Sequence, residues 1–243
     1  MLTMNQQLLH HTLAKYYDNI YCFRDYLDES VRLQNLIEKY LETGGNSVLD
    51  VACGSGLHLK HLKDDFSCTG VDISKAMLKL ARKNVEGVNF KEADMKTLQI
   101  GKQFDVVMCL FSSIGYVKTY LNLERTIQGF SRHIKEGGLV LIEPSHAESA
   151  YVQGEPRITT YDGKDMKIAR VNYASLRQAL AVVNMHILIA EKGVDAKYFV
   201  DRHDLGVSGV DETLRIMAEA GLKAKYLKGG LMPGRELFIG IKK

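Results

Sequence analysis

Short apolar runs alternate with longer amphipathic stretches in the first half of the chain. The runs occupy residues 48–51, 68–73, 88–95, 104–110 and 138–144. Each run is too short for a helix and predicts a buried strand. Stretches between them, such as residues 121–134, have the spacing of amphipathic helices. Strands that alternate with helices predict βαβ units and a parallel sheet.

This alternation ends after residue 144. Strand-like runs then follow with no helix between them, at residues 167–174, 181–190 and 197–202. They predict an antiparallel layer inserted into the sheet region. Beyond the layer, Ser208 is expected to cap a helix over residues 211–220, and Gly221 to end it. Two further strands, near residues 223–227 and 236–241, then complete a seven-stranded sheet.

The segment before the first strand is rich in tyrosine and precedes the pair Gly44-Gly45. It predicts two helices. The expected organisation has four parts: a helical cap at 1–45, a ligand-binding core at 46–144, an inserted layer at 145–205, and a final helix with a strand hairpin at 206–243.

The turn after the first strand carries the main chemical signal. The strand ends VLDV and continues as ACGSG, so that Asp50 precedes the glycines Gly54 and Gly56. Glycines allow a ligand to approach the backbone closely, and the helix that begins near Ser55 directs free N–H groups toward it. A dinucleotide fold would require a third glycine where this chain has Leu59, and no G-x-x-x-x-G-K-[ST] loop is present.

The turn resembles the first motif of S-adenosylmethionine-dependent methyltransferases with a Rossmann-like fold. The resemblance implies an α/β fold with a seven-stranded, mostly parallel sheet, flanking helices and the inserted antiparallel layer. S-adenosylmethionine is then the expected cofactor and S-adenosylhomocysteine the product. The expected cofactor-binding residues are Tyr17, Asp50, Ala52, Gly54, Gly56, Asp72, Ile73, Met77, Asp94, Met95 and Leu110.

Two acidic strand ends have specific expected roles. Asp72, at the end of the second strand, can accept hydrogen bonds from both ribose hydroxyls. The alternative is that Asp72 only caps the helix after it. In the resembled family, the pair equivalent to Asp94-Met95 lies at the adenine.

The segment after the fourth strand narrows the class of methyltransferase. Enzymes that methylate base or amide nitrogens carry [DNS]-P-P-[YFW] there, whereas residues 111–116 are FSSIGY. This segment resembles the FSSIGH of bacterial nucleotide-aminosugar N,N-dimethyltransferases, with Tyr116 in place of the histidine. Further matches lie at residues 14–21, 142–144, 185–186 and 226–238. The resemblance implies N-methylation of a small amine, such as an amino sugar. A small-molecule O-methyltransferase and an inactive cofactor-binding sensor or scaffold are the alternatives.

Five residues are candidates for the acceptor side of the site. Tyr17, Tyr116 and Glu143 could orient an amine or relay its proton. Arg235 could bind a phosphate or carboxylate of the substrate, or only an acidic residue at the surface. His186 is a further catalytic candidate, although it could be a buried core histidine, and His203 is open to the same two interpretations. The inserted layer and the N-terminal helices are expected to cover the transferred methyl group.

Composition limits the partners. The chain of 243 residues is 46% hydrophobic with a net charge of +3, which neither demands nor excludes an anionic partner. No apolar run approaches the roughly 18 residues of a membrane span. The four cysteines are scattered without a CxxC pair and are expected to be reduced thiols. We therefore expect a cytoplasmic enzyme with a small-molecule substrate, no metal, and no membrane or nucleic-acid partner. A homodimer is one open form of assembly.

Overall fold

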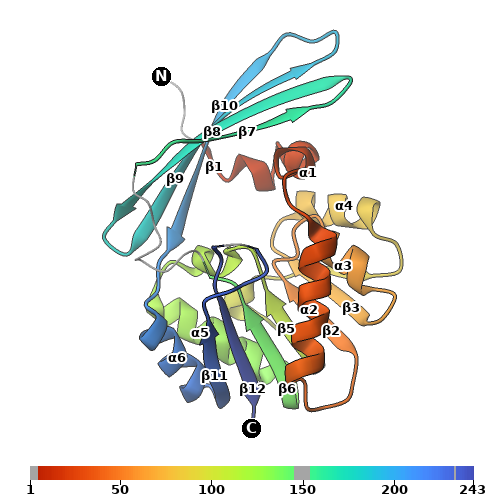
Figure 1. The fold of residues 1–243 in the computed structure, drawn as a ribbon, viewed down its shortest axis with the longest axis vertical. Coiled ribbons are helices and arrows are strands. Elements are labelled where there is room, and N and C mark those ends of the chain that lie inside the picture. Colours follow the sequence, from red (N-terminus) through yellow and green to blue (C-terminus); the bar gives the residue numbers. More distant parts are fainter. Residues whose placement is uncertain (1–4, 145–153, 233) are drawn as a thin grey trace.

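The computed structural model describes residues 5–144, 154–232 and 234–243. Two sheets dominate these residues: a seven-stranded sheet of order β11-β12-β6-β5-β2-β3-β4, and a five-stranded sheet of order β1-β10-β9-β8-β7. The second sheet lies beyond one end of the first, with a short helical segment between them (Figure 1). The predicted Rossmann-like α/β class with an inserted antiparallel layer is confirmed.

The seven-stranded sheet is parallel except at its C-terminal hairpin, where β12 runs antiparallel to β6 and β11. Its third strand is shorter than predicted, because Asp94 accepts a hydrogen bond from Lys96 N and begins the 3-10 turn η3, Met95–Thr97. The strands are β2 Ser47–Val51, β3 Ser67–Asp72, β4 Asn89–Glu92, β5 Phe104–Cys109, β6 Ile134–Ile142, β11 Leu222–Leu227 and β12 Leu237–Lys242.

Helices cover both faces of this sheet. On one face, α5 (Tyr120–Arg132) and α6 (Val210–Glu219) bury Phe130 and Met217 against the strands. On the other face, α2 (Tyr26–Tyr40), α3 (Leu57–Leu62) and α4 (Lys75–Asn84) bury Leu33, Leu59 and Leu78. Removal of such apolar surface from water is the main force that holds these layers together.

The structure differs from one predicted cap, Ser208, and from the alternative that Asp72 caps a helix. Ser74, not Asp72, caps α4, because its hydroxyl accepts from Met77 N at 3.2 Å. Ser208 is not a cap, because its Oγ accepts from Thr213 Oγ1 and the N-cap position of α6 is Gly209. Gly221 follows the end of α6 at a φ of +81°, the left-handed conformation that glycine adopts readily.

The antiparallel sheet contains the predicted runs and two strands that were not predicted, β7 and β1. Strand β1 comes from the N-terminal segment and pairs parallel with β10. The start of the predicted insertion, residues 145–153, lies outside the described residues. The strands are β1 Asn5–Gln6, β7 Arg157–Asp162, β8 Met166–Arg177, β9 Leu180–Glu191 and β10 Lys197–Gly206.

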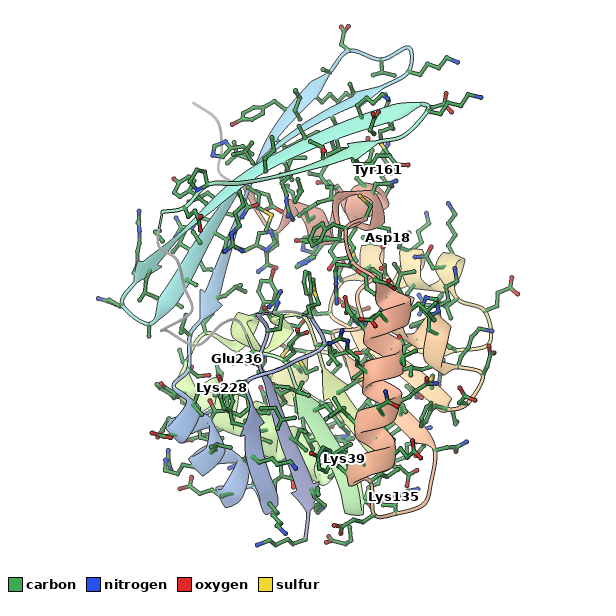
Figure 2. The ribbon with its side chains drawn as sticks, viewed as in Figure 1. Asp18, Lys39, Lys135, Tyr161, Lys228 and Glu236 are labelled. Atoms are coloured by element: carbon green, nitrogen blue, oxygen red, sulfur yellow. The ribbon has the colours of Figure 1, made fainter. Side chains whose placement is uncertain are left out.

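The first of the two predicted N-terminal helices is instead a series of short turns, η1 (Leu8–His10), η2 (Ala14–Tyr16) and α1 (Tyr17–Ile20). These turns lie between the two sheets, as the position of α1 shows (Figure 1). Asp18 of α1, marked in Figure 2, accepts from Asn84 Nδ2, which also donates to Ser55 O in the glycine turn. The N-terminal segment is thereby attached to the ligand-binding end of the core.

The opposite end of the core is held by Asp105. Its carboxylate accepts from Thr43 Oγ1 at 2.7 Å and from Lys135 Nζ at 3.0 and 2.9 Å. Lys135 lies at the end of the molecule far from Tyr161 and the antiparallel sheet (Figure 2). This network is structural and remote from the site. Among the described residues, no helix has both the length and the apolar character needed to cross a membrane.

Candidate active site

Two adjoining cavities lie where the carboxyl ends of β2, β3 and β5 meet the antiparallel sheet. The Asp72 cavity has a volume of about 460 Å³, and the Arg24 cavity has a volume of about 210 Å³. They share several lining residues, so they form one continuous site. The shared residues are His10, Tyr17, Ala52, Gly54, Ser113 and Tyr116.

The structure brings the predicted cofactor-binding residues together, with one exception. Those that line the two cavities are Tyr17, Asp50, Ala52, Gly54, Asp72, Ile73, Met77, Asp94, Met95 and Leu110. Gly56 does not line either cavity. It begins α3 at a φ of +77°, and a Cβ there would lie 3.2 Å from Phe90 and 3.3 Å from Ala81. Gly56 therefore allows close packing of the helix rather than contact with a ligand.

Asp72 is fixed by the backbone at the end of β3. Its Oδ2 accepts from Gly54 N at 2.9 Å and its Oδ1 accepts from Ser74 N at 2.8 Å. Burial raises the pKa of this carboxyl, while these hydrogen bonds oppose the rise. A carboxylate has further acceptor positions, so Asp72 can still accept hydrogen bonds from hydroxyls in the cavity.

Asp50 lies deeper, at the end of β2, and is 2% exposed. Burial, with a further contribution from the Asp72 charge, raises the pKa of Asp50 to about 8. A buried carboxyl with this pKa is largely protonated at neutral pH, and a bound cation would favour its ionised form. The position suits a positively charged group of a ligand.

Arg24 was not among the predicted site residues, although it lines the smaller cavity. Its guanidinium lies 3.8 Å from the centre of the Phe111 ring, and Arg235 lies 4.9 Å from the same ring. Arg24 Nε also donates to Glu29 at 3.0 Å. Two guanidinium groups therefore line this end of the site, and each has a carboxylate nearby, Glu29 for Arg24 and Glu143 for Arg235. The sequence signal for Arg24 is only a lone basic residue among aromatic residues.

Glu143 does not lie where it was predicted. Its side chain is fully buried and lines neither cavity. Oε2 accepts from Phe111 N at 2.7 Å, and Oε1, for which the described part of the chain offers no hydrogen-bond partner, lies 3.8 Å from Arg235 Nε. Phe111 and Ser112 have φ values of 51° and 65°, a left-handed conformation that is unfavourable for such residues. Glu143 therefore supports the turn at Phe111 and Ser112, called the Phe111 turn below, and also supports Arg235, without lining the cavity.

Tyr17, Tyr116 and Arg235 line the site as predicted, whereas His186 does not. Along β9, Val183 and Met185 face the cavity, so His186 points to the other side of the sheet, where its Nδ1 contacts the Tyr198 hydroxyl. The prediction that His186 lies at the site is wrong. His10 and His203 lie there instead. No group of three or more potential metal ligands is found among the residues that the structure describes.

The comparisons with known proteins agree with this geometry. Residues 48–138 match the methyltransferase domain family. The chain is 33% identical over 234 residues to the dTDP-3-amino-3,4,6-trideoxy-alpha-D-glucopyranose N,N-dimethyltransferase of Streptomyces venezuelae, covering 94% of this chain and 97% of that one. It is 28% identical over 232 residues to the dTDP-3-amino-3,6-dideoxy-alpha-D-glucopyranose N,N-dimethyltransferase of Streptomyces fradiae, covering 94% and 90%.

Solved structures show the same similarity. The crystal structure of DesVI from Streptomyces venezuelae superposes with a TM-score of 0.90 at 30% identity, covering 95% of this chain and 98% of that chain. The sugar N-methyltransferase KedS8 from Streptoalloteichus superposes with a TM-score of 0.86 at 28% identity, covering 93% and 92%. The fold and site are those of a methyltransferase. More specifically, the chain belongs to the family of these sugar N,N-dimethyltransferases, and its cofactor is S-adenosylmethionine.

The residues present fit this cofactor. The larger cavity contains Asp72, an acceptor for hydroxyl groups, and the adjoining cavity contains the buried carboxyl of Asp50. Between them, Gly54 has a φ of +56°, and a Cβ there would come within 3.6 Å of Met77 Cε. A glycine turn, a hydroxyl-binding carboxylate and a second carboxyl for a cation match an adenosine joined to a charged amino acid.

Proposed function

We propose that this chain N-methylates the amine of a small amino sugar carried on a nucleotide. The observation that carries the proposal is the composition of the Arg24 cavity. Tyr17 and Tyr116 provide hydroxyl groups suited to an amine, and Arg235 provides a cation for an anionic group. The relatives named above act on dTDP-linked amino sugars, which contain both groups.

The residues of the larger cavity would hold the cofactor. Asp72 would accept from the ribose hydroxyls, and Asp94 with Met95 would contact the adenine. Asp50 would face the amino group at the methionine end, beside Gly54. When bound, the sulfonium of the cofactor supplies an activated methyl group. The chain then has to align an uncharged amine with that methyl group and exclude water.

The protein residues around the acceptor have distinct proposed tasks. Tyr17 and Tyr116 would orient the amine through their hydroxyl groups. Arg235 would hold an anionic part of the substrate, since its Nη1 already donates to Ser112 Oγ at 2.6 Å and its position is fixed. Glu143 would act only by supporting Arg235 and the Phe111 turn.

The test is transfer of a radiolabelled methyl group from S-adenosylmethionine to a panel of acceptors. The panel contains dTDP-linked amino sugars, the matched hydroxyl sugars and free amino sugars. We expect one or two methyl groups on nitrogen, with the hydroxyl sugars unreactive and the free sugars poor substrates. Transfer to the hydroxyl sugars alone would establish the O-methyltransferase alternative. Cofactor binding without transfer to any acceptor would support a sensor or scaffold.

We further propose that two copies associate through the outer face of the antiparallel sheet. Ile158, Val171 and Leu188 are exposed there by 67%, 39% and 47%, and Ile158 lies directly opposite Val171. An apolar patch of this kind is suited to a second identical patch across a two-fold axis. Light scattering should give a dimer that Leu188→Lys converts into a monomer. A wild-type monomer at tens of micromolar would contradict the proposal.

A cytoplasmic location is proposed from the cysteines. Cys22, Cys53, Cys68 and Cys109 are free thiols, and Cys22 is exposed. Unpaired thiols are typical of reducing compartments.

A further inference from the structure

Three polar side chains, hydrogen-bonded in series, extend from the site into the antiparallel sheet. The Tyr116 hydroxyl lies 2.5 Å from His203 Nδ1, and His203 Nε2 lies 2.9 Å from Asp201 Oδ2. Asp201 is fully buried and His203 is 2% exposed. Tyr116 lines both cavities and His203 lines the Arg24 cavity, but the Nδ1 atom of His203 is occupied by the Tyr116 hydroxyl. The substrate can therefore reach this series of hydrogen bonds through the Tyr116 hydroxyl.

The direction of each hydrogen bond follows from Asp201. Its carboxylate also accepts from Leu8 N at 2.8 Å and Leu9 N at 2.9 Å, so it is held as an acceptor. His203 must then donate its Nε2 proton to Asp201 and use Nδ1 as an acceptor. Tyr116 donates its proton to Nδ1, which leaves the lone pairs of its oxygen available to a group in the cavity.

Two ionisable groups beside His203 are held in their neutral forms. His10, on η1, faces both rings, but burial and the neighbouring His203 lower its pKa to about 3. Burial also raises the pKa of Tyr116 well above 10, with smaller contributions from Tyr21, Asp201 and Asp72. His10 therefore stays neutral, and Tyr116 does not persist as a phenolate. Of the three side chains in the series, His203 is the one whose charged form has a carboxylate partner.

We infer that His203, held by Asp201, accepts the substrate's ammonium proton through Tyr116. The ammonium N–H bond breaks as its proton moves to the Tyr116 oxygen, and the Tyr116 O–H proton moves to His203 Nδ1. The products are a neutral amine with a free lone pair, an unchanged tyrosine and an imidazolium paired with Asp201. The proton returns through Tyr116 to water after the product leaves. This inference rests on the proposed N-methylation, and it makes His203 and Asp201 positioning residues behind Tyr116.

The test compares pH–rate profiles of the wild type, Tyr116→Phe and His203→Asn on one amine substrate. Below the pKa of the amine, only a small neutral fraction can react without the relay, so we expect kcat to fall about 10- to 100-fold in both variants near pH 7. The loss should shrink as the pH approaches the pKa of the amine. Cofactor affinity and KM should change little. The double variant should be no slower than either single variant.

The sheet supplies a matched control on its other face. His186 Nδ1 contacts the Tyr198 hydroxyl, the same pair of atoms as in the relay, but this pair lies outside the cavity. Tyr198→Phe should therefore leave the whole pH profile unchanged.

Two results would overturn the inference: an unchanged profile in Tyr116→Phe, or an equal loss of kcat at every pH. The second result would indicate a structural role. If His203→Asn does not fold, Tyr116→Phe decides the question, because it keeps the His203–Asp201 pair. Failure of the proposed function is distinguishable, because the wild type itself would then methylate no amine at any pH, and the inference would be lost with it.

Discussion

The site has two halves that are built in different ways. The cavity base, which consists of Asp50, Gly54 and Asp72, comes from a single stretch of about 20 residues and is positioned by backbone hydrogen bonds. The cavity cover consists of His10, Tyr17, Val183, Met185 and His203, from segments far apart in the chain. The cover is positioned by side-chain contacts and by Asp201, which joins β10 to the backbone of η1.

This difference separates the two binding tasks. The base can hold the same cofactor in any protein with this turn, because its geometry depends on a short local sequence. The cover belongs to the acceptor and can change with it, because its residues are independent of that turn. If this division is correct, variants of the base should change cofactor affinity, and variants of the cover should change turnover or acceptor affinity.

The largest effect is expected at Asp72. Asp72→Asn should weaken binding of S-adenosylhomocysteine about 10- to 100-fold, or about 1.5–3 kcal/mol, because it replaces charge-assisted hydrogen bonds with neutral ones. Calorimetry measures this affinity, and a melting curve checks that the variant is folded. Asp162→Asn, on the antiparallel sheet, is the matched control and should bind normally. An unchanged affinity in Asp72→Asn would contradict the proposal that the cavity base binds the cofactor.

A smaller effect, restricted to the acceptor, is expected at Arg235. Arg235→Gln should raise KM for a nucleotide-linked amine about tenfold, because it removes a cation that faces the anionic part of the substrate. Cofactor affinity should stay the same, and KM for an uncharged amine should change little. Arg215→Gln, on the exposed face of α6, is the control. An equal rise in KM for charged and uncharged acceptors would mean that Arg235 only supports the Phe111 turn.

The residues of the cavity base could be predicted from the sequence, because the patterns that indicate them are local. An apolar run that ends in Asp50 and continues through glycines predicts both the strand and the turn. The chain position of Asp72 at the next strand end places it beside that turn. Gly56 is the exception. Its contact with Phe90 depends on how α3 packs against β4, and no local pattern contains that information.

The cover could not be predicted in the same way. Alternation along β9 and β10 defines two faces, but which face lies inside depends on the turns that pack against it. His186 and His203 are both histidines on strand-like runs beside apolar residues. They differ because Asp201, two residues before His203, binds the backbone of η1 and turns that face inward. Arg24 and Glu143 likewise acquire their places through contacts with Phe111, which is distant in sequence from both.

The smallest expected effect concerns the pH dependence of cofactor binding. The pKa of Asp50 in the free protein is about 8, because of burial and the charge of Asp72. A cationic ligand group beside Asp50 lowers this pKa, so binding releases a proton at neutral pH, and affinity rises with pH until Asp50 is ionised in the free protein. Between pH 7 and pH 8 the rise attributable to Asp50 should be about fivefold.

The amino group of the ligand titrates in the same range, so the comparison with Asp50→Asn isolates the contribution of the protein. This variant cannot ionise at position 50, and its affinity should lack the fivefold rise. Calorimetry in two buffers with different ionisation enthalpies should count a released proton for the wild type and fewer for the variant. Equal proton release in both proteins would mean that Asp50 stays neutral when the cofactor binds. The positive charge of the ligand would then have to be balanced by Asp72, the other carboxylate of the base.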